Sequence, residues 1–260
     1  MVDPIAGADS GATSATAGGP PGGGAAPTGA WRTATVAGLR RPIARSVELR
    51  LDVHDRIDHL PGQHYVVRLT AEDGYTAQRS YSVASAPGDP LVELFVERLD
   101  DGEVSTYLAD VVEPGDELEV RGPIGGWFVW DGATPALLVG GGSGVVPLVA
   151  MVRHARAIGR LDLLRVAVSA RTLDALPYAE ELAEAGALVV LTREAHGIRP
   201  AARLTSMDLL PLWEPGQTAF VCGSAGFAEA ASQLLVGLGM PPASVRVERF
   251  GPSALEQPKR

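Results

Sequence analysis

Cysteine and lysine are almost absent from this chain of 260 residues. Cys222 is the only cysteine, so no internal disulfide can form, and an iron–sulfur cluster, which usually needs four thiolates, is excluded. Lys259 is the only lysine among 22 basic residues, a bias that carries little functional information. The five histidines lack metal-ligand spacing, and we expect no metal site.

An excess of basic charge and an uninterrupted apolar run are also missing. The formal net charge of −9 argues against nucleic acid as a partner. Residues 133–152 carry no charge over the length of a membrane-spanning helix, but glycines and prolines interrupt them, which favours a strand, a tight turn and a helix. The N-terminus lacks a secretory signal pattern. We therefore expect a soluble cytoplasmic protein without membrane association, of undetermined oligomeric state.

Composition divides the chain into three regions. Residues 1–30 are mostly Gly, Ala, Pro, Ser and Thr, and we expect a disordered tail because such a segment cannot bury enough apolar surface. Residues 31–132 show short β-like runs between Pro-Gly and Asp-Gly turns, with one short helix at 104–109, which predicts a small antiparallel β-barrel domain. The expected strands are Trp31–Val36, Val47–Val53, His64–Leu69, Arg79–Ala84, Leu91–Arg98 and Glu117–Arg121.

Residues 133–260 follow a different rhythm, in which apolar strands alternate with helical stretches. This pattern predicts an α/β domain with a parallel, Rossmann-like sheet covered on both faces. The expected strands are Ala136–Val139, Leu163–Ser169, Ala187–Thr192, Thr218–Cys222 and Ser244–Glu248. The expected helices are Val146–Ile158, Tyr178–Ala185, a short piece near Ala201–Leu209, and Phe227–Leu238.

A glycine-rich string joins the first of these strands to the first helix. It includes Gly142, Ser143 and Gly144, and Pro147 follows in the first helical turn, where its missing N–H is not needed. Glycines let the backbone approach a pyrophosphate, and a helix N-terminus offers free N–H groups. The string therefore predicts a dinucleotide site, although an ordinary glycine-rich turn would look the same.

A second short motif, Arg79-Ser80-Tyr81-Ser82, lies in an expected barrel strand. Alternation along a strand sends Arg79 and Tyr81 to one face and Ser80 and Ser82 to the other. Arginine suits phosphate and tyrosine suits ring stacking. By itself the motif describes a surface arginine beside a half-buried tyrosine equally well.

The order of the motifs along the chain is more specific than any one of them. It runs from Pro61–His64 through Arg79–Ser82, Gly102–Ser105, Gly125–Phe128 and the glycine-rich turn to Cys222-Gly223 and Glu248–Pro252. This series resembles the ferredoxin–NADP reductase superfamily, above all the flavin and nicotinamide modules of bacterial oxygenase reductases and flavohaemoproteins. The resemblance covers residues 31–252.

The resemblance implies a flavin site in the barrel. In the family, the arginine matching Arg79 binds flavin phosphate, the tyrosine matching Tyr81 stacks on the isoalloxazine, and the serine matching Ser82 lies near flavin N5. The segment matching Gly102, Val104 and Ser105 supplies backbone N–H groups to the pyrophosphate. The resemblance favours FAD over FMN, and Ser80 is included among the candidate cofactor-binding residues.

It also implies a nicotinamide site at the end of the fourth parallel strand. The Cys-Gly of the family that matches Cys222 and Gly223 lies beside the nicotinamide, whereas without the resemblance Cys222 is equally a small buried thiol. Cys222 is not expected to be a nucleophile. Glu248 and Phe250 match a Glu-x-Phe whose acid lies near the reaction centre and whose ring lies near the flavin. For Glu248, proton transfer and polar orientation remain open.

The choice between the two dinucleotides depends on the end of the second parallel strand. Ser169 and Arg171, assisted by Arg193, favour the 2′-phosphate of NADP, although Arg171 could also simply lie on the surface. Asp174 is close enough in sequence to leave NAD open.

The resemblance thus predicts an NAD(P)H-dependent FAD reductase that passes electrons to a separate acceptor protein, such as a ferredoxin, an oxygenase or a haem protein. Two alternatives remain: a reductase of free flavin or ferric chelates, and a non-catalytic flavin or nucleotide sensor. Tyr81, Ser82, Cys222 and Glu248 are the candidate catalytic residues. An acidic ferredoxin would need a local basic patch, for which Arg40, Arg41 and Arg45 are candidates.

Overall fold

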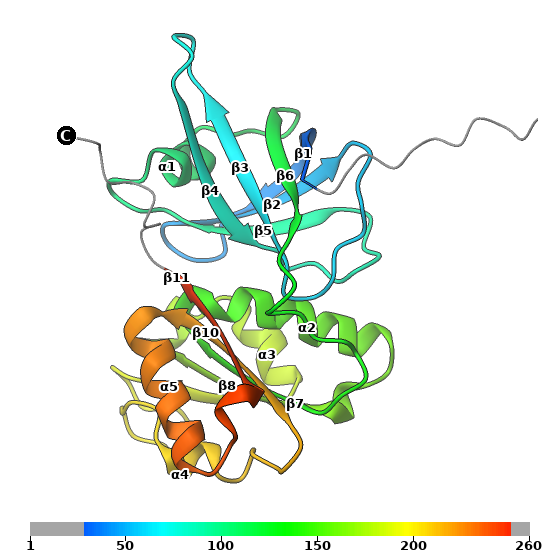
Figure 1. The fold of residues 1–260 in the computed structure, drawn as a ribbon. Helices are drawn as coiled ribbons and strands as arrows, with labels where there is room; N and C mark the ends of the chain where they lie inside the picture. Colours follow the sequence, from blue (N-terminus) through cyan, green and yellow to red (C-terminus); the bar gives the residue numbers. More distant parts are fainter. Residues whose placement is uncertain (1–28, 251–260) are drawn as a thin grey trace, which may run out of the picture.

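The computed structural model describes residues 29–250. The tail expected at residues 1–30 lies outside this range except for its last two residues. Two sheets dominate the molecule, an antiparallel one formed by β1–β6 and a parallel one formed by β7–β11 (Figure 1). The fold class predicted from the sequence, a β-barrel followed by a Rossmann-like α/β unit, is confirmed.

The antiparallel sheet has the strand order β4-β3-β6-β1-β2-β5, and an isolated bridge from Val83 to Leu94 joins the end of β4 to β5, which closes the barrel. Fully buried side chains such as Leu49, Tyr65 and Leu94 fill its interior. The elements are β1 (Trp31–Arg40), β2 (Ser46–Val53), β3 (His64–Thr70), β4 (Thr76–Ser82), β5 (Val92–Glu97), α1 (Glu103–Asp110) and β6 (Glu117–Ile124).

The parallel sheet has the strand order β11-β10-β7-β8-β9. Helices α2 and α3 cover the face turned toward the barrel, and α4 and α5 cover the other face (Figure 1). Because β8 and β10 flank β7 on opposite sides, the sheet has its topological switch point there, where ligands bind in open α/β sheets. The elements are β7 (Ala136–Gly141), α2 (Val146–Ala157), β8 (Leu164–Ala170), α3 (Ala179–Glu184), β9 (Leu188–Leu191), α4 (Ser206–Leu209), β10 (Thr218–Ser224), α5 (Ala225–Gly237) and β11 (Val245–Phe250).

Four short 3-10 turns complete the described part of the chain. They are η1 (Gly142–Val145), η2 (Leu161–Leu163), η3 (Leu173–Ala175) and η4 (Pro242–Ser244). The first of them lies between β7 and α2, so the glycine-rich string forms a tight turn before the helix proper begins.

Most elements differ from their predicted extent by a few residues at their ends, and for β1 and α4 the structure shows the reason. Strand β1 continues to Arg40, because a register shift between Val36 and Gly38 lets it go on pairing with β2. The helix expected near 201–209 is only one turn, α4, because the guanidinium of Arg199 binds the carbonyls of the preceding loop and the Asp208 carboxylate. Thr205 and Asp208 then form a capping box, which fixes the helix start.

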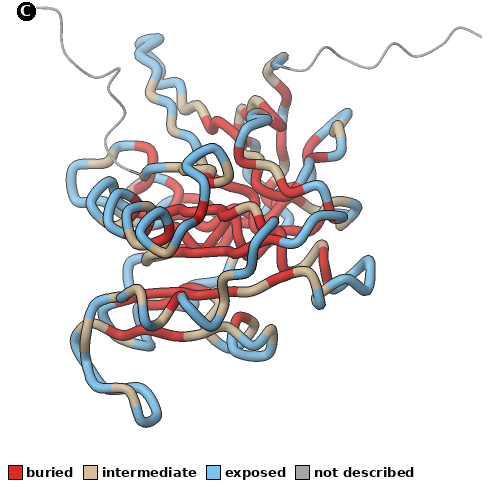
Figure 2. Tube along the Cα trace, turned by 60° about the horizontal axis from the view of Figure 1, so that its bottom comes forward, coloured by how far each residue is buried: buried red, intermediate tan, exposed pale blue. Residues whose placement is uncertain are grey.

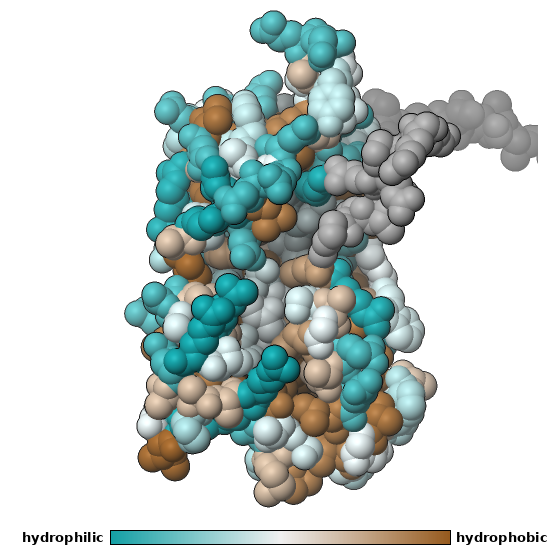
Figure 3. Space-filling model, turned by 90° about the vertical axis from the view of Figure 1, so that its left-hand side faces the viewer, coloured by the Kyte–Doolittle hydropathy of each residue, from teal (hydrophilic) through white to brown (hydrophobic). Residues whose placement is uncertain are grey.

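Burial follows the two sheets, with the buried segments concentrated along their strands (Figure 2). No helix within residues 29–250 is long and apolar enough to cross a membrane. On the side of the molecule that carries α5, hydrophobic residues gather toward the end of the molecule away from the barrel (Figure 3). Met207 and Leu210 of the α4 region and Val236 of α5 are among the exposed apolar residues.

Candidate functional site

The carboxyl ends of four parallel strands bring three predicted site residues, Ser169, Cys222 and Glu248, into one row. Cys222 of β10 pairs with Gly140 of β7 on one side and with Glu248 of β11 on the other. Ser169 of β8 pairs with Gly141. Residues from four strands, far apart in sequence, therefore meet at the switch point of the sheet.

The glycine-rich turn packs directly on this row. A Cβ added at Gly144 would lie 2.4 Å from the Cys222 carbonyl oxygen and 2.5 Å from the Gly223 Cα, so no larger residue fits. Gly142 has a φ of +56°, a left-handed conformation that glycine adopts without strain. Pro147 lies in the first turn of α2, as predicted, and no side chain caps the N-terminus of that helix. The free N–H groups of this turn are thus available to an anion.

A histidine and a glutamate connect the row to the barrel. His64 begins β3 and pairs with Ser82 of β4, and its Nδ1 lies 4.0 Å from Oε1 of Glu248. The junction between barrel and parallel sheet therefore carries a chain of spatial neighbours, in the order Ser82, His64, Glu248 and Cys222. No sequence motif assigns His64 a role of its own, since only the tertiary structure places it opposite Glu248.

Burial sets the protonation of these groups. It raises the pKa of Glu248 to about 7, and Oε2 of this carboxyl is buried without a hydrogen-bond partner within the described chain. Burial also lowers the pKa of His64, so near neutral pH both groups tend toward their uncharged forms. Burial, and to a smaller extent Glu248, raise the pKa of the Cys222 thiol. A raised pKa keeps this group as the protonated thiol, which is the less nucleophilic form.

The Arg79–Ser82 motif lies on β4 with the predicted alternation at its first three positions. Arg79 and Tyr81 are half-buried, Ser80 is exposed, and Ser82 is buried where the strand ends. The Tyr81 hydroxyl is buried and has no hydrogen-bond partner among residues 29–250, and burial raises its pKa. A half-buried ring with an unsatisfied hydroxyl is consistent with a site built to receive an aromatic, polar ligand.

The Gly102–Ser105 segment forms the start of α1, as the resemblance implied. Gly102 is the extended N-cap residue, and no side chain caps the helix. The Ser105 hydroxyl is occupied within the segment, because it accepts from the Leu99 N–H at 3.1 Å and donates to the Gly102 carbonyl at 3.1 Å. Ser105 therefore shapes the turn, and the backbone N–H groups of residues 103–105 are the groups left for a ligand.

The two arginines predicted to bind a 2′-phosphate are neighbours in space. The Arg193 N–H donates to the Arg171 carbonyl at 2.9 Å, and both residues are exposed beyond the ends of β8 and β9. Two carboxylates share this edge: Asp174 accepts from the Thr172 hydroxyl, and Glu194 accepts from the Leu173 N–H at 2.7 Å. The edge therefore carries both signs of charge.

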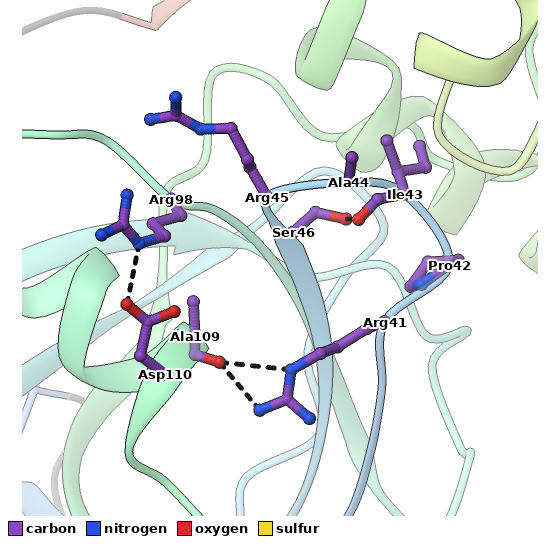
Figure 4. A pocket seen from close by; sticks show the side chains of 9 residues that line it. All are labelled: Arg41, Pro42, Ile43, Ala44, Arg45, Ser46, Arg98, Ala109 and Asp110. Carbon is purple, nitrogen blue, oxygen red and sulfur yellow. Dashed lines mark hydrogen bonds and ion pairs between the residues drawn. The ribbon is translucent and has the colours of Figure 1, made fainter.

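The basic patch proposed from the sequence is largely neutralised. Arg40 pairs with Glu48, Arg45 with Asp100, and Arg41 donates to the Ala109 carbonyl at the end of α1. A hollow of about 270 Å³ is lined by Arg41, Arg45 and Arg98, and Arg98 donates to Asp110 at 2.8 Å (Figure 4). These contacts mainly stabilise the loop before β2 and the end of α1, so they give little support to docking of an acidic protein there.

Known proteins with similar sequences and structures are oxidoreductases. Residues 43–129 match the family described as oxidoreductase FAD-binding domain. A ferredoxin–NAD(P)(+) reductase component of naphthalene 1,2-dioxygenase and salicylate 5-hydroxylase systems from a Ralstonia species is 29% identical over 80% of this chain. The match covers 65% of that relative, so this chain spans less than two-thirds of its length.

Solved structures show the same fold. A cytochrome P450 reductase from Amycolatopsis superposes with a TM-score of 0.73 at 25% identity, over 86% of this chain and 70% of that protein. A ferredoxin NADP+ reductase from Neisseria gonorrhoeae, solved with FAD and NADP, superposes with a TM-score of 0.70 at 17% identity, over 86% of this chain and 99% of that protein. At that identity the second likeness concerns the fold alone.

Proposed function

We propose that this chain is an NAD(P)H-dependent FAD reductase of the ferredoxin–NADP reductase superfamily, which supplies electrons to a separate acceptor protein. In this proposal residues 31–132 form the FAD-binding domain and residues 133–260 form the nucleotide-binding domain. Bound FAD would supply the chemistry, since a flavin can take a hydride from a reduced nicotinamide and release electrons singly.

The observation that carries the proposal is the short distance between the two halves. His64 Nδ1 and Glu248 Oε1 lie 4.0 Å apart, with Ser82 as the strand neighbour of His64 and Cys222 as the strand neighbour of Glu248. Had the two candidate sites opened on opposite sides of the molecule, no hydride could pass between ligands held in them. Their common junction supports a transfer reaction.

Each side chain then has a task that its surroundings suit. Arg79 binds a flavin phosphate, the Tyr81 ring stacks on the flavin, and the Ser82 hydroxyl donates at its polar edge. The backbone N–H groups at the starts of α1 and α2 bind the two pyrophosphates. Ser80, Phe250, Ser169, Arg171 and Arg193 complete the proposed cofactor contacts, with NADP as the first nucleotide and NAD as the second.

Glu248 is proposed to hold a proton at its buried Oε2 near neutral pH and to orient the nicotinamide. A carboxyl with a pKa of about 7 exists in both protonation states under ordinary conditions, which suits either a proton donor or a hydrogen-bonding orienter. Cys222 is fully buried and Gly144 packs on its carbonyl; in this proposal the small thiol and Gly223 lie beside the nicotinamide at the end of β10.

Anaerobic stopped-flow absorbance with NADPH and NADH tests the reaction. Rapid bleaching of the flavin band near 450 nm supports both enzyme hypotheses and contradicts the hypothesis of a non-catalytic sensor. A protein that stays colourless after reconstitution with FAD contradicts the proposal. Steady-state reduction of cytochrome c then distinguishes the two enzyme hypotheses. A requirement for added ferredoxin supports a protein acceptor over free flavin or ferric chelates.

The preference for NADPH over NADH is testable at Arg171. Replacing Arg171 by Ala should raise the Kd for NADPH about tenfold and leave that for NADH within about twofold, because a charge-assisted contact to phosphate contributes about 1.5–3 kcal/mol. Arg165→Ala, which removes an arginine near the other end of β8, away from Arg171, is the control. Equal effects on both nucleotides would show that Arg171 does not read the phosphate.

A further inference from the structure

A buried polar cluster joins the barrel to the parallel sheet at a place separate from the His64–Glu248 contact. We call it the Arg153 clamp, and it consists of Arg153 of α2, Glu93 of β5, Glu181 of α3, Tyr178 before α3, and the carbonyl of Ala84. Its two central groups are well shielded, with 20% of the Arg153 side chain and 6% of the Glu93 side chain exposed.

The guanidinium of Arg153 reaches three chain segments at once. Nη1 donates to Glu93 Oε1 at 2.8 Å and to the Ala84 carbonyl at 3.0 Å, both in the barrel. Nε and Nη2 donate to the carboxylate of Glu181 at 2.9 Å each, in the manner of a two-pronged fork. Four of its five N–H donors are thus used, two toward each half of the molecule.

Tyr178 completes the cluster from the side. Its hydroxyl donates to Glu93 Oε1 at 3.0 Å, and its ring lies 5.0 Å from the Arg153 guanidinium carbon. Phe95 of β5 contacts the same ring, with 5.9 Å between centroids. Tyr178 has a φ of +56°, a conformation that a tyrosine rarely adopts, so tertiary contacts hold the backbone there.

The positions of these residues along the chain suggest what the clamp does. Ala84 follows the Arg79–Ser82 motif by two residues, and Arg153 lies on the helix that the glycine-rich turn begins. One side chain therefore connects the proposed flavin segment with the proposed pyrophosphate segment. The apolar contact beside it is small, with Ala84, Phe95 and Val146 as its buried members. Small interfaces between domains ordinarily permit relative motion.

We propose that Arg153 is a positioning residue, which fixes the orientation of the nucleotide half against the flavin half by binding Glu93, Ala84 and Glu181 simultaneously. This inference rests on the proposed function for its consequence but not for its geometry. Burying an arginine between two carboxylates is a poor source of net stability, because the desolvation of the charges offsets their attraction. A single relative orientation is what the arrangement provides instead.

The test substitutes Arg153 by Lys, which keeps the charge but cannot reach three acceptors in the fixed geometry of a guanidinium. Arg156→Lys is the matched control, since Arg156 lies on the same helix and forms ion pairs with Glu181 and Glu184 of the same half of the molecule, at 3.5 and 3.7 Å. Spin labels are placed on Glu117→Cys in the barrel and Ala230→Cys in α5, both exposed. The natural Cys222 is fully buried and stays unlabelled.

Pulsed electron–electron double resonance then measures the distance between the two spin labels. We expect one narrow distribution for the parent and for R156K, and a distribution at least twice as broad for R153K. In the reconstituted enzyme, R153K should lose at least tenfold in the rate of flavin bleaching at saturating NADPH, with the Kd for NADPH changed less than twofold. A fold that is merely weakened would not produce this separation of rate from affinity.

Unchanged distributions in R153K, or equal broadening in R156K, would overturn the proposal. If R153K does not fold, Tyr178→Phe decides, because it removes only the hydroxyl that binds Glu93: some broadening supports the clamp, and a distribution identical to the parent contradicts it. If NADPH does not bleach the flavin of the parent protein, while the distance distribution of R153K is still broader than that of the parent, the proposed function is contradicted and the role of the Arg153 clamp is supported.

Discussion

At the scale of single residues, the surroundings of Glu248 change its chemistry. Burial raises its pKa from 4.5 to about 7, so between these values the folded protein binds more protons than the unfolded chain. Stability contributed by the protonated carboxyl is therefore complete below pH 4.5 and is lost as the pH rises toward 7. The carboxyl is partly exposed, with a quarter of the side chain accessible, so the whole effect is at most about 3 kcal/mol.

The variant Glu248→Gln should remove this dependence. We expect it to match the parent near pH 5 and to be more stable by about 1–3 kcal/mol at pH 8, because glutamine stays neutral where the buried carboxyl must ionise. Urea denaturation at both pH values measures the difference. Glu97→Gln, at an exposed position of β5, should leave the pH dependence unchanged, and equal pH slopes in E248Q and the parent would contradict the assigned burial effect.

At the scale of elements, the contact between the glycine-rich turn and β10 requires glycine at position 144. A methyl group there would collide with the Cys222 carbonyl oxygen and with Gly223. Gly144→Ala should separate the turn from the strand, lower the stability by about 1–3 kcal/mol and weaken NADPH binding at least tenfold, with the flavin content retained. Isothermal titration calorimetry and a flavin absorbance measurement check both parts.

Gly226→Ala provides the control for this prediction. Gly226 lies in the first turn of α5, and an added Cβ would meet open space. The variant should bind NADPH like the parent and be as stable or up to about 1 kcal/mol more stable, because alanine favours helix. Unimpaired NADPH binding by Gly144→Ala would show that the turn does not contact the dinucleotide.

At the scale of the whole molecule, the two halves should respond differently to loss of FAD. A ligand stabilises the folded state that binds it, by about 4 kcal/mol at a thousand times its Kd. Hydrogen exchange of the flavin-stripped protein should therefore increase across β1–β6 and change little across β7–β11. Equal deprotection of both sheets would show that barrel and parallel sheet open as one unit.

The sequence by itself determined the two architectures and the approximate extent of almost every strand and helix. Alternating apolar residues and Pro-Gly turns specify an antiparallel barrel, and apolar runs joined by helices specify a parallel sheet, because these patterns depend on local periodicity. The glycine-rich turn before α2 was predictable for the same reason. The single-turn α4 was not, because the Arg199 guanidinium, which pairs with Asp208, binds backbone carbonyls of the preceding loop.

Tertiary structure alone decided how the two halves meet. No local pattern places His64 opposite Glu248, assigns Arg153 to Glu93, or pairs the arginines of the supposed basic patch with carboxylates. The His64–Glu248 and Arg153–Glu93 contacts depend on which surfaces the two completed sheets bury against each other. The pairs of Arg40 and Arg45 form within the barrel, once its strands and loops have come together. Likewise, the pKa of Glu248 depends on burial, which belongs to the folded molecule and not to the residue type.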